Sequence, residues 1–338
     1  MITVPPQFTI SQISTVQGAR ELAMTPQGDL YVGTRGNTVY VIRNAEDEHP
    51  GSARVYVRFD DAPASGVAYG NGTLYVGTQH AIWRVEHGRP VKLVSVRTGN
   101  PPAGSDGDVH TTTSVAVDGS TLYASVGSSC NACVEIDPTR ATVGKVENGR
   151  YTVIAKRIRN AIALAVDPRT HHLWVSNAGQ DTLPVGHPYE YFDDVSIRHQ
   201  PVDYGWPDCN ELHRCPNVAV PQVTFPAYET PIGAVFYPAA TNLKYEFPPQ
   251  YRGGAFITFH GSWHGPAQGL GGFEPPRVVF VGLPKSAHWT EFAGGYQNGG
   301  SSERIGRPSG IAVGPQGDLF VADDESGAIY RIRPKQAH

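Results

Sequence analysis

A short apolar phrase recurs six times along this chain, and each copy ends in a small residue. The copies read LYVG, LYVG, LYAS, LWVS, AFIT and LFVA, and they begin at residues 30, 74, 122, 173, 255 and 319. Branched and aromatic residues of this kind favour β-strands. A turn containing glycine precedes most copies, and a second apolar run precedes that turn, as at residues 66–69 and 114–117. The repeated unit is therefore strand, tight turn, strand.

The spacing of the copies predicts the fold. The first three intervals are close to the roughly 40–50 residues of a four-stranded propeller blade, and the longer later intervals indicate inserted loops. We expect an all-β, six-bladed β-propeller of four-stranded antiparallel blades, with residues 1–338 as a single domain. A β-sandwich is the alternative, but it does not require so regular a repeat. Residues 7–14 are expected to pair with residues 328–332 and so close the ring.

Composition narrows the classes of function. The chain has 338 residues, with 38 Gly, 28 Pro and only 2 Met, which favours short strands and turns over long helices. A net charge of −4 leaves no basic excess for a general nucleic-acid binder. Because no run of about 18 apolar residues occurs, we expect no membrane span.

The four cysteines form two local pairs, Cys130 with Cys133 and Cys209 with Cys215. One zinc site is a possible interpretation, because zinc ligands often come in such pairs. The second spacing is wide for a zinc knuckle, however, and the two pairs lie far apart in sequence. Two local disulfides in an exported protein are the interpretation that we favour.

Three blades carry a basic residue at the same point, directly before their first strand. These residues are His110, Arg159 in the pair Arg159-Asn160, and Arg307. A single His or Arg at a strand entrance is usually structural. Three at equivalent positions near the propeller axis instead suit an anionic, oxygen-rich ligand and the abstraction of a proton.

Two loops at strand ends carry further polar groups. Residues 177–181, which read NAGQD, have turn carbonyls that could hold Ca²⁺, although an ordinary Asn-Gly type of turn explains the spacing equally well. Residues 323–325 are three acids in a row, which we interpret as a solvated turn without a specific role.

Several segments together carry a resemblance to a known family. They are residues 125–133, 158–161, 173–177, 203–207, 260–263 and 306–313, among them YGWP and HGSW. With these segments the chain resembles the soluble pyrroloquinoline quinone (PQQ)-dependent sugar dehydrogenases, and is closest to their sorbosone dehydrogenase-like branch. The resemblance extends over nearly all of the chain from about residue 20.

The resemblance implies a cofactor, a metal and a set of site residues. It implies a six-bladed propeller with PQQ and Ca²⁺ at its axis that oxidises aldoses or related aldehydes. The matching positions are His110 as general base, Arg159 and Asn160 at the quinone C5 oxygen, Gly179 and Gln180 as carbonyl ligands of calcium, and Arg307 at the PQQ carboxylates.

The chain also departs from the family at the axis. Ser128 lies where the family has an Asp that supports the catalytic His, and Ser309 lies at about the place of a second arginine. The family's carboxylate-binding Lys falls close to His260 or Gly261, which makes His260 a candidate cofactor contact. Where the family has a Gln that contacts the substrate, this chain has only residues 63–65 (PAS). Where the family has an acidic residue before the calcium turn, this chain has Asn177. Fewer cations should weaken the binding of PQQ.

The sequence therefore predicts a PQQ- and Ca²⁺-dependent dehydrogenase of an aldose or sugar-derived aldehyde. His110 would take the hydroxyl proton, hydride would pass to the quinone, and the electrons would leave to an external acceptor. We expect a periplasmic or secreted monomer or homodimer. Two alternatives are a Ca²⁺-dependent six-bladed lactonase or esterase, and a non-catalytic propeller that binds a sugar, a glycan or a protein.

Overall fold

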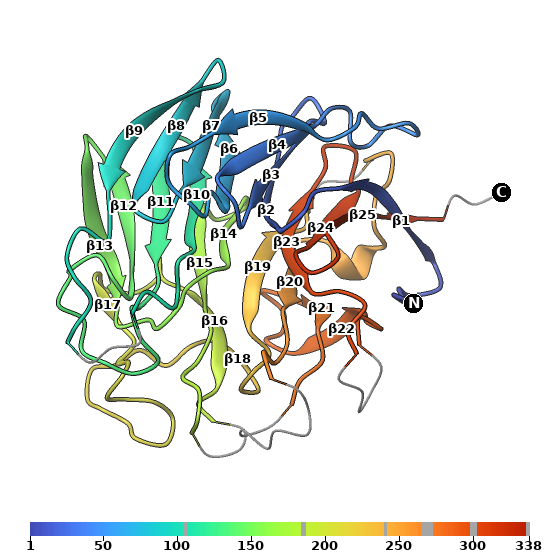
Figure 1. The fold of residues 1–338 in the computed structure, drawn as a ribbon. Coiled ribbons are helices and arrows are strands. Elements are labelled where there is room, and N and C mark those ends of the chain that lie inside the picture. Colours follow the sequence, from blue (N-terminus) through green and yellow to red (C-terminus); the bar gives the residue numbers. More distant parts are fainter. Residues whose placement is uncertain (104–106, 184–186, 240–241, 265–272, 298–302, 336–338) are drawn as a thin grey trace.

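Six antiparallel sheets are arranged around a central axis (Figure 1), as the repeat predicted. The computed structural model describes residues 1–103, 107–183, 187–239, 242–264, 273–297 and 303–335. We number the sheets as blades 1 to 6 in chain order and call the strand nearest the axis of each blade its inner strand. No helix in these described ranges is long and apolar enough to cross a membrane. The interpretation of the whole chain as one domain stays a prediction.

The first three blades follow one another along the chain without large insertions. Blade 1 contains β2 (Ala19–Met24), β3 (Leu30–Thr34), β4 (Thr38–Ile42) and β5 (Arg54–Arg58). Blade 2 contains β6 (Gly66–Gly70), β7 (Thr73–Gly77), β8 (Ala81–Glu86) and β9 (Arg89–Ser95). Blade 3 contains β10 (Thr113–Asp118), β11 (Thr121–Val126), β12 (Thr142–Glu147) and β13 (Arg150–Lys156).

The last three blades carry the insertions and the ring closure. Blade 4 contains β14 (Leu164–Asp167), β15 (His172–Asn177), β16 (Glu190–Asp194) and β18 (Val223–Phe225). Blade 5 contains β19 (Pro231–Phe236), β20 (Ala255–Phe259), β21 (Arg277–Val281) and β22 (Trp289–Ala293), with a 3₁₀ turn η1 (Pro249–Tyr251) in the β19–β20 connection. Blade 6 contains β23 (Pro308–Val313), β24 (Leu319–Asp323), β25 (Ala328–Pro334) and β1 (Phe8–Thr15).

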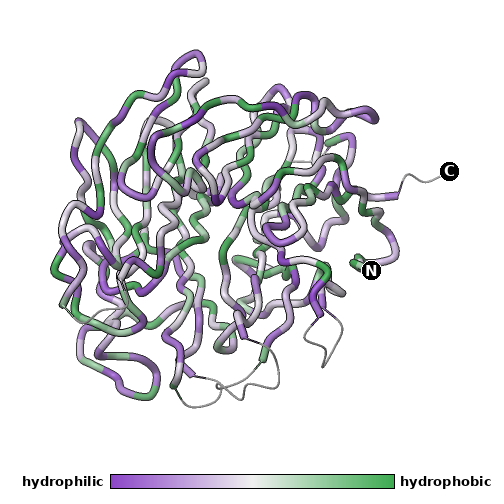
Figure 2. Tube along the Cα trace, viewed as in Figure 1, coloured by the Kyte–Doolittle hydropathy of each residue, from purple (hydrophilic) through white to green (hydrophobic). Residues whose placement is uncertain are grey.

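The recurring phrase forms the second strand of every blade. Its copies lie in β3, β7, β11, β15, β20 and β24. These strands are hydrophobic on both faces because each blade packs between two neighbours, and their residues are almost all buried. Figure 2 shows hydrophobic stretches within the blades and hydrophilic stretches in many of the outer loops.

The N-terminal strand closes the ring, which confirms the predicted pairing. β1 lies antiparallel to β25, with Phe8 opposite Pro334 and Ile10 opposite Ile332, and both termini lie on this side of the molecule (Figure 1). The ring of Phe8 is only 2 % exposed and packs against Phe247 and Phe292, with centroid distances of 4.5 and 5.2 Å. Blade 6 thus joins the two ends of the chain and packs on blade 5.

An insertion between β16 and β18 extends blade 3 and holds the second cysteine pair. Its short strand β17 (Val202–Asp203) pairs in parallel with β13, a fifth strand that the repeat did not predict. Cys130–Cys133 and Cys209–Cys215 are both disulfides, which confirms the favoured interpretation of the cysteines over zinc.

Truncation of the closing strand's aromatic anchor should destabilise the whole ring. We expect Phe8→Ala to lower the free energy of unfolding by about 3–5 kcal/mol, because the removed ring leaves a cavity in a closed aromatic cluster. Urea denaturation followed by tryptophan fluorescence measures the change. The matched control is Ser11→Ala on the exposed face of β1, which should change the stability by less than about 0.5 kcal/mol. Equal stabilities for the two variants would contradict the role of β1 as a latch.

Candidate active site

A cavity of about 290 Å³ lies where the loops before several inner strands meet. We call it the axial pocket. His110 and Asn160, which precede β10 and β14, both line it, so the predicted register brings these two residues together. Two arginines of blade 1 that the sequence analysis missed, Arg20 and Arg35, line it as well. Pro63 and Ser65 complete part of the wall at the position where the family pattern has a glutamine.

The hydrogen bonds of His110 fix the protonation of its ring. Nδ1 lies 3.0 Å from the carbonyl oxygen of Ser128 and 2.9 Å from Ser128 Oγ. Ser128 Oγ donates its own hydrogen to the carbonyl of Cys130, at 2.7 Å, so both neighbours of Nδ1 act as acceptors. Nδ1 must therefore carry the hydrogen, which leaves the lone pair on Nε2. No described residue donates a hydrogen bond to Nε2.

Two buried residues hold His110 in this position. The guanidinium of Arg97 donates to the carbonyl oxygens of His110 and Thr112, at 2.8 and 2.9 Å, and so fixes the backbone that enters β10. Gly127 allows its backbone to lie close to His110 and Asn160, since a Cβ at this position would lie 2.6 Å from the Cβ of His110 and 2.7 Å from Asn160 Oδ1. Arg97 was not singled out in the sequence because its bonds are to backbone atoms of a separate loop.

The environment keeps the imidazole of His110 neutral. Burial, with a further contribution from the charge of Arg159, lowers the pKa of His110 to about 3. A carboxylate at position 128 would oppose this shift, but Ser128 provides only neutral acceptors. The ring is thus an unprotonated acceptor over the whole physiological pH range.

A buried carboxylate, Asp324, joins several basic groups beside the axial pocket. Asp324 Oδ2 lies 2.7 Å from Arg20 and 3.5 Å from Arg35, and Oδ1 lies 2.9 Å from His260 Nε2. Burial alone would raise the pKa of Asp324, but these partners lower it well below the usual range. The interpretation of residues 323–325 as a solvated turn was therefore wrong, because Asp323 and Asp324 are both buried.

His260 and Arg307 lie together on the blade 5 and blade 6 side of this cluster. Burial, and then the charge of Arg307, lowers the pKa of His260 to about 3, so His260 is neutral and donates Nε2–H to Asp324. Arg307 donates to the carbonyls of His260 and Gly261, at 3.0 and 2.9 Å. Neither His260 nor Arg307 lines the axial pocket, so their side chains border the cluster rather than the cavity.

Arg159 is held in a network behind Asn160. Its guanidinium forms an ion pair with Asp181 at 2.9 Å and donates to both the backbone and side-chain oxygens of Asn131, at 3.1 and 3.0 Å. The indole N–H of Trp263 donates a hydrogen bond to Asp181 at 3.2 Å, and Trp263 remains 56 % exposed. The contact of Arg159 with a quinone oxygen stays a prediction, because the guanidinium does not line the cavity.

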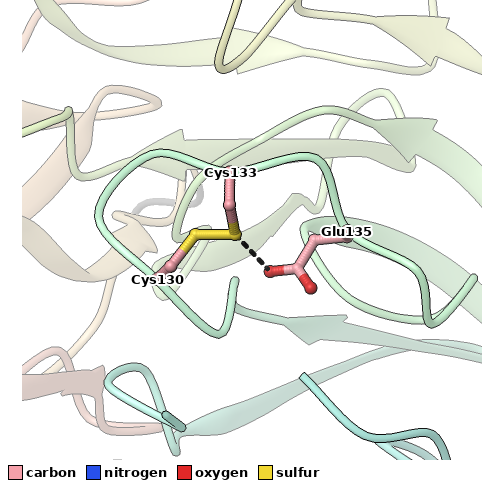
Figure 3. Close-up of side chains that lie close together, drawn as sticks. All are labelled: Cys130, Cys133 and Glu135. Atoms are coloured by element: carbon pink, nitrogen blue, oxygen red, sulfur yellow. Dashed lines mark hydrogen bonds between the residues drawn. A yellow bond between two sulfur atoms is a disulfide. The ribbon is translucent and has the colours of Figure 1, made fainter. Parts of the chain in front are cut away.

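The Cys130–Cys133 disulfide closes the loop that presents Asn131 to Arg159. Figure 3 shows this disulfide with Glu135, whose Oε1 lies 3.9 Å from Cys133 Sγ. Glu135 also accepts from the backbone N–H of Ser129, at 2.5 Å. In the part of the chain that the structure describes, these three residues are the one close group of metal-ligating side chains, and two of them are already joined in the disulfide.

The turn at residues 178–181 has two carbonyls that its neighbours leave unused. The Ala178 carbonyl accepts from Arg159, and the Asp181 carbonyl accepts from Asn131, at 3.3 and 3.1 Å. No described group donates to the carbonyls of Gly179 and Gln180, the predicted calcium ligands. Glu190 supports the turn from below by accepting the Gly179 N–H at 3.1 Å.

The axial pocket has an excess of positive charge. Arg20 and Arg35 share the single charge of Asp324. Glu21, the one acid of β2, is half-buried, and desolvation raises its pKa to about 8, which favours its neutral form at pH 7. The sequence signal for these missed residues was the presence of two adjacent charged residues, Arg20 and Glu21, inside an otherwise apolar inner strand.

Comparisons with known proteins agree with the fold. A family model described as TrAA12-like matches residues 205–335. An uncharacterised protein from Borreliella burgdorferi is 20% identical over 347 residues, a match that spans 94% of this chain and 86% of that protein.

Solved structures extend the likeness to the whole chain. The calcium structure of the Trichoderma reesei carbohydrate-active enzyme of family AA12 has a TM-score of 0.78 at 15% identity and covers 99% of this chain and 97% of its own. The holo PQQ domain of pyranose dehydrogenase from Coprinopsis cinerea gives 0.77 at 15%, with 98% and 97% covered. PQQ-bound aldose sugar dehydrogenase from Streptomyces coelicolor gives 0.65 at 16%, with 98% and 100% covered. The chain therefore shares its fold with PQQ-dependent sugar dehydrogenases, as its sequence motifs indicated, while its place in the sorbosone branch stays a prediction.

Proposed function

We propose that this protein is a PQQ- and Ca²⁺-dependent dehydrogenase that oxidises an aldose or a sugar-derived aldehyde. The observation that carries the proposal is the axial pocket, where one neutral histidine with an unprotonated Nε2 faces a cavity bordered by arginines. A base and a set of cations in one cavity suit the removal of a proton next to a bound anion. The shared fold with proteins whose structures contain PQQ supports the same conclusion.

The residues present fit an anionic quinone. Arg20 and Arg35 line the cavity, and Ser309 donates its hydroxyl to the carbonyls of Ala19 and Arg20, at 2.9 and 3.2 Å. The place of the family's second arginine thus holds a small residue that supports Arg20 from the adjacent blade. Asn160 Oδ1, buried without a hydrogen-bond partner among the described residues, is a polar atom that a ligand or its water could satisfy.

A hard cation would find oxygen ligands at the neighbouring turn. The carbonyls of Gly179 and Gln180 are the candidates, and Ca²⁺ prefers such oxygens. Two backbone carbonyls make a weak site alone, so the bound cofactor would have to complete the coordination. The calcium structure of the AA12 relative supports this part of the proposal.

The chain's own groups would act on the substrate as follows. PQQ supplies the two-electron acceptor when it is bound. His110 Nε2 accepts the proton of the substrate hydroxyl, because Nδ1–H is held by Ser128 and the ring cannot turn without losing that bond. Arg20 and Arg35 stabilise negative charge in the cavity. The exposed ring of Trp263, whose indole N–H is bound to Asp181 of the Arg159 network, offers an aromatic face for a sugar.

The other two functions have less support. A calcium-dependent hydrolase of this fold would hold its metal with several axial side-chain oxygens. In the described residues no such group of carboxylates lies at the axis, and arginines occupy the cavity instead. A non-catalytic sugar-binding propeller would not need an oriented, desolvated imidazole. The two disulfides suit an oxidising compartment, which supports a periplasmic or secreted location.

The neutral state of His110 can be tested directly. Its folded pKa lies below the usual 6.5, so it should not titrate between pH 5 and 8 in an NMR titration of labelled histidines, whereas the exposed His171 should titrate above 6.5. Since a depressed histidine pKa adds stability above pH 6.5, that contribution should disappear as the pH falls from 6.5 toward 3. His110→Asn identifies the resonance. A midpoint near 6.5 for His110 would contradict the desolvated base.

Removal of the base should abolish turnover without preventing cofactor binding. With PQQ and Ca²⁺ added, we expect the wild-type protein to reduce a dye in the presence of some member of an aldose and aldehyde panel. His110→Asn should lower kcat by about 10²–10⁴-fold while the Kd for PQQ changes by less than about threefold. His171→Asn, an exposed histidine far from the pocket, is the control. A fully active His110→Asn, or a wild-type protein that leaves the PQQ spectrum unchanged, would refute the proposal.

Loss of a pocket cation should weaken cofactor binding. Arg35→Gln is expected to raise the Kd for PQQ by about three- to tenfold, a modest effect because water partly screens the exposed guanidinium. The same change should reduce the dependence of PQQ binding on salt, because one cation that attracts the anion is lost. Equilibrium dialysis of the cofactor-free protein gives the Kd. Arg43→Gln is the matched control, since its side chain is similarly exposed and also paired with an acid, Asp29, but does not line the axial pocket. Identical Kd values for both variants would show that Arg35 does not contact the anion.

A further inference from the structure

A second cavity, also of about 290 Å³, lies between blade 4 and the insertion that carries the Cys209–Cys215 disulfide. We call it the side pocket. Its aromatic lining consists of Tyr189, Tyr191, Tyr204 and Trp206, and the disulfide forms part of the same wall. Ligand pockets in proteins are mostly apolar cavities with a few polar groups and begin at about this size. The volume suits a molecule of one or two rings.

Two of the aromatic side chains, Tyr204 and Trp206, have their polar atoms bound to other residues. The hydroxyl of Tyr204 donates to Asp193 at 2.6 Å, and the indole N–H of Trp206 donates to the Asn131 carbonyl at 3.3 Å. Tyr204 and Tyr191 stack with centroids 5.0 Å apart, and Tyr189, 45 % exposed, stacks on His187. Arg157, Glu211 and Arg214 also line the side pocket, so it combines flat aromatic walls with charged and polar groups.

The amide side chains of the side pocket are set up to donate. Asn177 Oδ1 accepts the backbone N–H of Asn160 at 3.1 Å. Asn210 Oδ1 accepts from the backbone N–H groups of Leu212 and His213, at 2.8 and 2.9 Å. Because both carboxamide oxygens are occupied, the NH₂ groups are the parts that remain for a ligand. Donors beside stacked rings match a flat aromatic molecule that carries carbonyl oxygens.

The side pocket shares a wall with the axial pocket. Asn177 lines the side pocket, Asn160 lines the axial pocket, and their hydrogen bond joins the two linings. Gln180, a predicted calcium ligand, also lines the side pocket. A molecule bound there would therefore lie one layer of side chains from the site of oxidation.

We propose that the side pocket binds a small aromatic quinone, and that this quinone is the acceptor that reoxidises the cofactor. The second half of the inference rests on the proposed function. In that step the acceptor gains two electrons and two protons and leaves as a hydroquinone, while the reduced cofactor loses two electrons and two protons and returns to its quinone form. Electrons and protons balance without another reactant.

Binding is tested first on the cofactor-free protein, with menadione as the probe in equilibrium dialysis. Tyr189→Ala should weaken menadione binding about five- to tenfold, because it removes one stacking wall, whereas Tyr189→Phe keeps the ring and should restore wild-type affinity. Tyr189 is partly exposed, so neither change threatens the fold. Equal affinities of the three proteins, absence of binding, or competition by cellobiose but not by 1,4-naphthoquinone would overturn the aromatic site.

Turnover then tests the role of the bound quinone. In the PQQ-loaded enzyme, Tyr189→Ala should raise the KM for menadione about five- to tenfold and leave the KM for sugar and the rate with ferricyanide unchanged, since that small anion needs no aromatic wall. Equal effects on both acceptors would refute the acceptor role. If menadione binds with the expected dependence on Tyr189 but no substrate is oxidised, the dehydrogenase proposal fails and the aromatic site stands.

Discussion

The pairing of β1 with β25 is the interaction on which the rest of the structure depends. A propeller blade is buried only if it has neighbours on both faces, so an open ring would leave blades 1 and 6 with apolar surfaces in water. The N-terminal strand completes blade 6 and anchors Phe8 among the aromatic side chains of blade 5. With the ring closed, the loops before the inner strands converge, and residues from the two ends of the chain, Arg20 and Asp324, form one ion pair.

The axial pocket combines a desolvated base with an excess of cations, and both features lower the basicity of that base. Burial and the charge of Arg159 lower the pKa of His110, and the hydrogen bond to the Ser128 carbonyl opposes only part of that shift. An anionic ligand in the cavity would reverse part of this shift, because its charge favours the protonated imidazole. The pocket is thus built so that its base gains strength when an anion is bound next to it. A neutral ligand would leave the base weak.

The sequence predicted the parts of the structure that depend on local pattern. The LYVG phrase identified the second strand of every blade, and the position before each inner strand brought His110 and Asn160 into one pocket. Arg20, Asp324 and Arg97 were missed because their roles come from partners far away in the chain or from bonds to backbone atoms. Local pattern cannot distinguish a solvated acid from one that is buried against an arginine of another blade. The direction of the Arg159 side chain was beyond prediction for the same reason.

Both disulfides stabilise loops that meet at Asn131. Its carbonyl accepts hydrogen bonds from Arg159 Nε and from Trp206 Nε1, so one atom joins the network behind the axial pocket to the wall of the side pocket. The Cys130–Cys133 disulfide closes the loop that presents Asn131, and the Cys209–Cys215 disulfide closes part of the insertion that carries Trp206 to it. These loops contain little regular structure of their own, and each disulfide stabilises its loop by restricting the conformations of the unfolded chain. Both disulfides therefore stabilise the boundary between the two pockets, where a precise separation of donor and acceptor would matter most for electron transfer.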